Sequence, residues 1–136
     1  MQFSIMNALG TPGVDYSTIS VAGNLNLTAT SLDPFTIQLV GVDYTGLGVG
    51  TANTFNSGQS YQWTLLSAGS ITNFDASAFH FDTSTYFSNA APGTFFVTDV
   101  GNDLVLNFTP VPDPSTWMLM ASGVLALGAA VRRRRR

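Results

Sequence analysis

Residues 95–109 have the sequence FFVTDVGNDLVLNFT, in which two alternating runs meet at a glycine and an asparagine. In the second run Leu104, Leu106 and Phe108 alternate with mostly polar residues, as in a strand that buries one face. Gly101-Asn102 between two such runs is a hairpin signal, because these residues accept the backbone angles of a tight turn. The stretch therefore predicts a β-hairpin with strands at 95–100 and 103–109.

The same period of two recurs in shorter runs upstream of this hairpin. It predicts strands at 16–21, 25–29, 35–42, 61–65 and 79–82. We expect Asp75 to cap a short helical turn over residues 76–78, and we expect residues 44–60 and 86–93 to be loops. No helical period persists for three turns before residue 110. Residues 1–109 are therefore predicted to form an all-β body, either a β-sandwich or the end of a β-solenoid.

The composition restricts what this body can do. The chain has 136 residues, no cysteine, and five basic residues, all of them in Arg132–Arg136. All its acidic residues are aspartates, so the body offers no cation to a phosphate backbone and we expect no nucleic-acid partner. Scarce charge with abundant Thr, Ser, Asn and Gly is typical of secreted β-rich surface proteins and is unusual for a cytosolic enzyme.

The sequence contains few residues from which a catalytic site could be built. His80 is the only histidine, and it alternates with phenylalanines as a solvent-facing strand residue would. Glycoside hydrolysis needs two carboxylates at a set separation, and the near pairs in the sequence are Asp75 with Asp82 and Asp99 with Asp103. Aspartates beside turns, however, usually form the turn. The second pair could also supply oxygen ligands to calcium, without the spacing of a known loop. We therefore expect no enzyme activity, no catalytic residue, no metal and no cofactor.

Three aromatic residues suggest a different role for the body. Tyr61, Trp63 and Tyr86 could together form an aromatic platform for sugars. The alternation of Tyr61, Trp63 and Leu65 instead favours a core position for Trp63.

Residues 111–117 have the sequence VPDPSTW, and an uncharged apolar run then extends to Val131. At roughly 1.5 Å per residue, residues 114–131 would form a helix of about 27 Å, close to the hydrocarbon thickness of a bilayer. Asp113 is placed to cap this helix and Pro114 to begin it. A core helix of a soluble domain would show a polar face and would rarely end in five arginines. We therefore predict a single C-terminal transmembrane helix over 114–131.

The arginines also predict the orientation of this helix. Positive residues beside a span stay on the cytoplasmic side, because moving them across the membrane is costly. The body would then lie outside the cytoplasmic membrane. Trp117 would lie at the opposite headgroup layer from the arginines.

This succession of features closely resembles the PEP-CTERM sorting signal of exopolysaccharide-producing Gram-negative bacteria. The motif residues that carry the resemblance are Val111, Pro112, Asp113, Pro114, Ser115, Thr116 and Trp117, followed by the apolar span and by Arg132, Arg133, Arg134, Arg135 and Arg136. The resemblance implies an exported protein that is held transiently in the membrane. Its tail, residues 110–136, would be processed by exosortase, a membrane-embedded enzyme resembling a cysteine transpeptidase.

Within that tail, Pro112, Asp113 and Pro114 would be the element that the processing enzyme recognises, a substrate site rather than a catalytic one. Asp113 stands where the family usually has glutamate, so the charge is kept on a side chain one methylene shorter.

The body is similar, more loosely, to the last coils of autotransporter-associated β-strand repeats. The run YSTISVAGNLNL at residues 16–27 carries this likeness, which extends over residues 16–109 and implies the capping end of a parallel β-helix. Residues 1–10 show neither a basic start nor a continuous apolar stretch, so no signal peptide is predicted there. We therefore expect residues 1–109 to be the C-terminal part of a longer exported protein, or the start to be assigned too late.

Together these features predict a non-enzymatic protein of the cell surface, cell envelope or extracellular biofilm matrix, with the membrane, exosortase and exopolysaccharide as partners. One alternative is a carbohydrate-binding module. Another is the anchor of a larger polysaccharide-acting β-helix enzyme.

Overall fold

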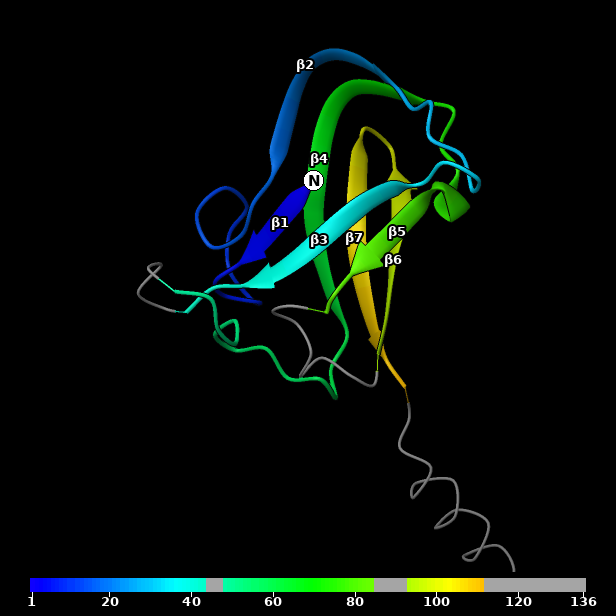
Figure 1. The fold of residues 1–136 in the computed structure, drawn as a ribbon. Helices are drawn as coiled ribbons and strands as arrows, with labels where there is room; N and C mark the ends of the chain where they lie inside the picture. The colour runs from blue at the N-terminus through cyan, green and yellow to red at the C-terminus, as the bar shows by residue number, and fades with distance from the viewer. Residues whose placement is uncertain (44–47, 85–92, 112–136) are drawn as a thin grey trace, which may run out of the picture.

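The computed structural model describes residues 1–43, 48–84 and 93–111 (Figure 1). It contains seven strands: β1 (Gln2–Ile5), β2 (Ile19–Asn26), β3 (Phe35–Gly41), β4 (Tyr61–Thr72), β5 (Phe79–Asp82), β6 (Gly93–Val100) and β7 (Asp103–Pro110). One short 3₁₀ turn, η1 (Ala76–Ala78), precedes β5, and Asp75 caps it as predicted. The prediction of an all-β body is confirmed for the described residues.

From β1 to β6, consecutive strands alternate between two sheets. The three-stranded sheet has the order β1-β3-β5 and is parallel throughout. The four-stranded sheet has the order β2-β4-β7-β6, with β2 parallel to β4 and both pairings of β7 antiparallel. The chain thus packs two sheets face to face, as in a sandwich, while its first strands wind from sheet to sheet, as in a solenoid. Each of the two predicted architectures describes part of the fold.

The last strand, β7, interrupts this winding. After β6 the chain turns back at Gly101-Asn102, and β7 inserts between β4 and β6 (Figure 1). Of the two turn residues only Gly101 has a positive φ, 70°, which is the pattern of a type II′ hairpin turn. The predicted hairpin is confirmed, and it closes the four-stranded sheet.

The core lies between the two sheets. Its fully buried side chains come from both: Phe3, Ile5, Ile37 and Leu39 from one sheet, and Trp63, Val97, Leu106 and Phe108 from the other. Trp63 is 1% exposed, and its indole N–H donates to the carbonyl oxygen of Ala8 at 3.0 Å. The Tyr61 ring stacks on Trp63 with centroids 5.4 Å apart. The predicted core position of Trp63 is confirmed.

Within residues 16–29 the structure has one strand, β2 (Ile19–Asn26), where the pattern predicts two. Gly23, which would end a strand by its composition, instead lies in β2 with a φ of 136°, and the pairing with β4 shifts between Val21 and Asn24. Gly69 of β4 lies against this irregularity, where a Cβ would come within 3.0 Å of the Gly23 carbonyl oxygen. Because neither glycine carries a Cβ, the two backbones can approach closely here. The pairing of β4 with β2 continues beyond this point, and β4 extends past its predicted end to Thr72.

The pattern predicts no strand in residues 1–10, but β1 lies there and Phe3 and Ile5 are fully buried. The outer edge of β1 is hydrogen-bonded to the segment 15–17. Ser17 N–H donates to the carbonyl oxygen of Ser4 at 2.9 Å, and Met6 N–H donates to that of Asp15 at 2.8 Å. This segment protects an edge strand too short to be recognised by its period.

Candidate functional site

The C-terminal tail leaves the body from an interior strand of the four-stranded sheet. β7 ends at Pro110, which pairs with Gly93 at the start of β6. Val111 is 50% exposed and is the last described residue. The segment of interest for sorting therefore begins directly where the folded sheet ends (Figure 1).

Most of the predicted sorting tail lies outside the described residues. This holds for Pro112–Trp117 of the motif, for the predicted membrane helix over 114–131, and for Arg132–Arg136. Within residues 1–43, 48–84 and 93–111, no helix has the length and apolar character needed to cross a membrane.

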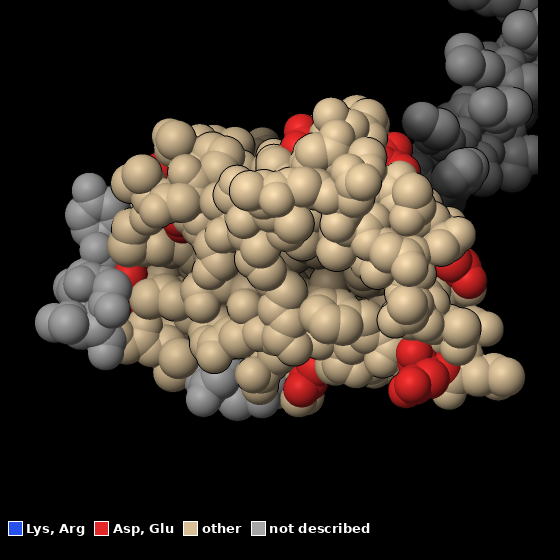
Figure 2. All heavy atoms as spheres, turned by 90° about the horizontal axis from the view of Figure 1, so that it is seen from above, with Lys and Arg blue, Asp and Glu red and all other residues tan. Residues whose placement is uncertain are grey.

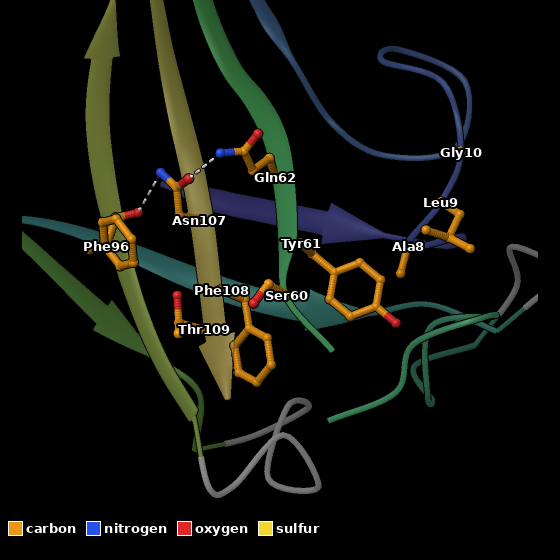
Figure 3. Close-up of a pocket in the computed structure, with 10 residues that line it drawn as sticks. All are labelled: Ala8, Leu9, Gly10, Ser60, Tyr61, Gln62, Phe96, Asn107, Phe108 and Thr109. Atoms are coloured by element: carbon orange, nitrogen blue, oxygen red, sulfur yellow. Dashed lines mark hydrogen bonds between the residues drawn. The ribbon is translucent and has the colours of Figure 1, made fainter. Parts of the chain in front are cut away.

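A groove of about 610 Å³ lies beside this junction, at the end of the four-stranded sheet from which the tail leaves (Figure 3). The residues that line it are Ala8, Leu9, Gly10, Ser60, Tyr61, Gln62, Phe96, Asn107, Phe108 and Thr109. Phe96, Asn107 and Gln62 are direct cross-strand neighbours on β6, β7 and β4, so their side chains share one face of the sheet. The core residues Tyr61 and Phe108 alternate with them and border the groove.

Asn107 holds the floor of this groove in place. It is only 5% exposed, and its Oδ1 accepts a hydrogen bond from Gln62 Nε2 at 3.0 Å. Its Nδ2 donates to Thr98 Oγ1 at 3.0 Å and to the carbonyl oxygen of Val105 at 2.9 Å. Because both the oxygen and the nitrogen of this buried amide are hydrogen-bonded, its orientation is fixed. The Gln62 amide, which donates to it, is therefore also held in one orientation.

Two apolar side chains flank the polar floor. Phe96 is 39% exposed on the β6 side, and Leu9 is 71% exposed on the far side of β4 (Figure 3). Between them lie the hydroxyls of Ser60 and Thr109 and the two amides. The arrangement combines one exposed aromatic ring with several neutral hydrogen-bonding groups.

Two of the three residues considered for an aromatic platform, Tyr61 and Trp63, are buried. Tyr61 is 5% exposed, and its hydroxyl donates to the carbonyl oxygen of Thr54 at 2.9 Å and accepts from Asn56 N–H at 2.8 Å. Trp63 lies in the core, and Tyr86 lies outside the described residues. Inward-facing positions of β4 bury both rings. The exposed aromatic residue that lines the groove is Phe96, whose outward position follows from its alternation with the inward-facing Phe95 and Val97.

Asp75 and Asp82, the first pair considered for glycoside hydrolysis, each form a local turn. Asp75 Oδ1 accepts from the Ser77 hydroxyl at 2.7 Å and from Ser77 N–H at 2.9 Å, and these bonds lower the pKa of Asp75. Asp82 Oδ1 accepts from the Ser84 hydroxyl at 2.6 Å and from Ser84 N–H at 3.0 Å, with the same effect on its pKa. The expected role of these two aspartates as turn formers is confirmed.

The other candidate residues also have simple surroundings. His80 is exposed on β5, as predicted. Asp99 and Asp103 flank the hairpin turn, where they pair with Leu104 and Val100. In the part of the chain that the structure describes, no three His or Asp side chains are grouped as a metal site would require.

The described surface carries aspartates and no Lys or Arg side chain. On the face shown in Figure 2 the aspartates lie mostly toward the margin, and the rest of the described surface on that face is free of Lys, Arg and Asp. No aspartate lines the groove. The groove is therefore a neutral site on an acidic body.

Comparison with known proteins identifies the tail. The PEP-CTERM protein-sorting motif matches residues 110–136, beginning at the last residue of β7. No curated protein and no solved structure matches the chain. The likeness of the body to autotransporter-associated repeats stays a prediction. The chain thus carries a PEP-CTERM sorting motif at residues 110–136, which supports exosortase-targeted sorting of an exported protein to the cell envelope or surface.

Proposed function

We propose that this protein is a non-enzymatic component of the cell surface or extracellular matrix, delivered there by its C-terminal tail. The tail holds the exported body in the cytoplasmic membrane until an exosortase-type enzyme processes it. The observation that supports this proposal best is the sorting motif at residues 110–136, which begins where β7 ends.

The short connection keeps the folded body close to the membrane. Residues 111–113 join β7 to the predicted start of the helix at Pro114, and they can span at most about 14 Å even when fully extended. The processing enzyme therefore meets the motif beside the folded end of the sheet. Because a proline disfavours a helical backbone at the residue before it, we expect Pro114 to favour an extended conformation at Asp113, in which the enzyme can reach the motif.

The fold also couples export to folding. β7 lies between β4 and β6, so the four-stranded sheet closes only after residues 103–110 have crossed the membrane. The arginines at 132–136 then stop transfer on the cytoplasmic side. The body thus completes its folding on the outer side of the cytoplasmic membrane while the tail still anchors it there.

Tail processing can be tested with variants of Asp113. The full chain, placed behind a cleavable signal peptide, is expressed in a host that encodes an exosortase and in the same host with that gene deleted. We expect membrane-bound precursor in the deletion strain and released or surface-bound product in the parent. Asp113→Asn should leave precursor in both strains, while Asp113→Glu, the matched control, should be processed. Equal processing of both variants, or of the chain in both strains, would contradict the proposal.

A second candidate function is the anchor of a larger polysaccharide-acting β-helix. The parallel pairing of β1 with β3 and of β2 with β4 favours it. Because the outer edge of β1 is bonded to residues 15–17, a preceding coil could pair directly only with β2. Peptides from upstream of Met1 in the native protein, detected by mass spectrometry, would support this candidate. A native N-terminal peptide that begins at Met1 would exclude it.

A further inference from the structure

We propose that the groove between Leu9 and Phe96 binds a segment of a neutral polysaccharide. The inference rests on the proposed function in one respect, since an exported body would meet such polymers outside the cell. It names a ligand class and a site, which the sorting motif does not.

The charge distribution selects the ligand class. None of the groove's lining residues is charged, and every charged side chain in the described body is an aspartate. An anionic polymer would be repelled by the net negative charge of the body, and no Lys or Arg side chain lies in the groove to pair with it. A neutral polymer meets neither obstacle.

Phe96 supplies a surface for the apolar face of a sugar ring. Its side chain projects from the outward face of β6, opposite to the core residues Phe95 and Val97, and remains 39% exposed. An aromatic ring over polar groups presents a flat apolar area next to hydrogen-bonding partners. Pyranose rings have the matching character, with an apolar C–H face and hydroxyls around the rim.

The floor supplies hydrogen bonds for those hydroxyls. The hydroxyls of Ser60 and Thr109 and the Oε1 atom of Gln62 have no partner within the described part of the chain, and all three line the groove. They can donate to and accept from sugar hydroxyls. Asn107 is a positioning residue, because its hydrogen bonds to Thr98 and Val105 hold the amide that fixes Gln62 before any ligand arrives.

The groove is large enough for such a ligand. Its volume of about 610 Å³ falls within the range of roughly 300–1,000 Å³ that is usual for small-molecule sites. The site would hold a short stretch of a chain rather than a whole polymer.

Affinity electrophoresis of the full chain in a mild non-ionic detergent tests the inference. The gels contain dextran, galactomannan or laminarin as neutral probes, and alginate or hyaluronan as anionic probes. We expect at least one neutral polymer to retard the protein and neither anionic polymer to do so. Phe96→Ala and Gln62→Ala should each weaken this retardation by roughly threefold to tenfold, the effect of losing one stacking or hydrogen-bonding contact.

Phe35→Ala is the matched control, because Phe35 is 43% exposed on β3 and lies outside the groove. It should leave retardation unchanged. Melting temperatures of all variants identify any that fail to fold, and Phe96→Leu then serves as a milder replacement. No retardation by any neutral probe, stronger retardation by an anionic one, or an equal loss in Phe35→Ala would overturn the inference. None of these results would alter tail processing, so the two proposals fail separately.

Discussion

Asn107 of β7 lies directly opposite Gln62 of β4, and their side-chain amides are joined by a hydrogen bond of 3.0 Å. Asn107 is buried, so its replacement would leave the Thr98 hydroxyl, the Val105 carbonyl and the Gln62 amide without their partner. We expect Asn107→Ala to lower the free energy of unfolding by about 1–3 kcal/mol. Chemical denaturation measures this loss. Asn102→Ala, in the exposed turn of the same hairpin, should change it by less than about 0.5 kcal/mol.

Gly93 is expected to tolerate no side chain. A Cβ at this position would overlap the ring of Phe108, which is fully buried. Gly93→Ala should therefore destabilise the body by about 1–3 kcal/mol through overpacking. The matched control is Gly50→Ala, whose Cβ would make only ordinary contact with Asp43 at 3.5 Å. Equal melting temperatures for the two variants would contradict the packing of Gly93 against Phe108 at the start of β6.

Trp63 is expected to stabilise the body through its indole N–H as well as its ring. In Trp63→Phe the carbonyl oxygen of Ala8, a residue only 4% exposed, would lose its hydrogen bond from Nε1. The lost hydrogen bond alone should cost about 1–3 kcal/mol, and the smaller ring adds a cavity. Thermal unfolding of the variant checks this. A variant as stable as the original chain would show that the bond contributes nothing.

The pKa values of Asp75 and Asp82 should depend separately on their serine partners. Each carboxylate has its pKa lowered by the hydroxyl and the backbone N–H of the serine two residues later. Ser77→Ala should raise the pKa of Asp75 and leave Asp82 unchanged, while Ser84→Ala should do the reverse. Carboxyl titration by NMR measures both. A shift of both carboxylates in either variant would contradict the local cause.

The same shifts predict how stability changes with pH. A carboxylate whose pKa is lower in the folded state stabilises that state above its unfolded pKa, about 3.9, and loses this contribution as the pH falls through the folded value. Stability from these two groups should therefore be constant from pH 7 to about pH 5 and should fall below about pH 4. Because both side chains are exposed, the effect should be small.

Local features of the body could be predicted from the sequence because short segments determine them. The Gly101-Asn102 turn, the alternation of β7 and the Asp75 cap all depend on neighbouring residues. β1 could not be predicted, because four residues are too few to establish a period. The continuous β2 could not be predicted either, because a glycine such as Gly23 usually marks the end of a strand. Here the strand continues through Gly23, with Gly69 of β4 lying against it.

The groove depends on pairing between distant strands. The alternation in residues 95–97 indicates that Phe96 faces outward, but it does not indicate which side chains lie beside it. Gln62 and Asn107 are 45 residues apart and become neighbours only because β7 inserts beside β4. The amides therefore look like ordinary exposed strand residues in the sequence, and the aromatic pattern draws attention to Tyr61 and Trp63 instead.

The intact mass of the mature protein at the cell surface tests the central claim most directly. The protein is purified from the surface or matrix fraction of an exosortase-encoding host and measured by mass spectrometry. We expect a product that lacks the apolar span and Arg132–Arg136 and that ends within or next to Pro112–Pro114, with or without an attached surface group. An exported product that still ends at Arg136 would contradict the claim.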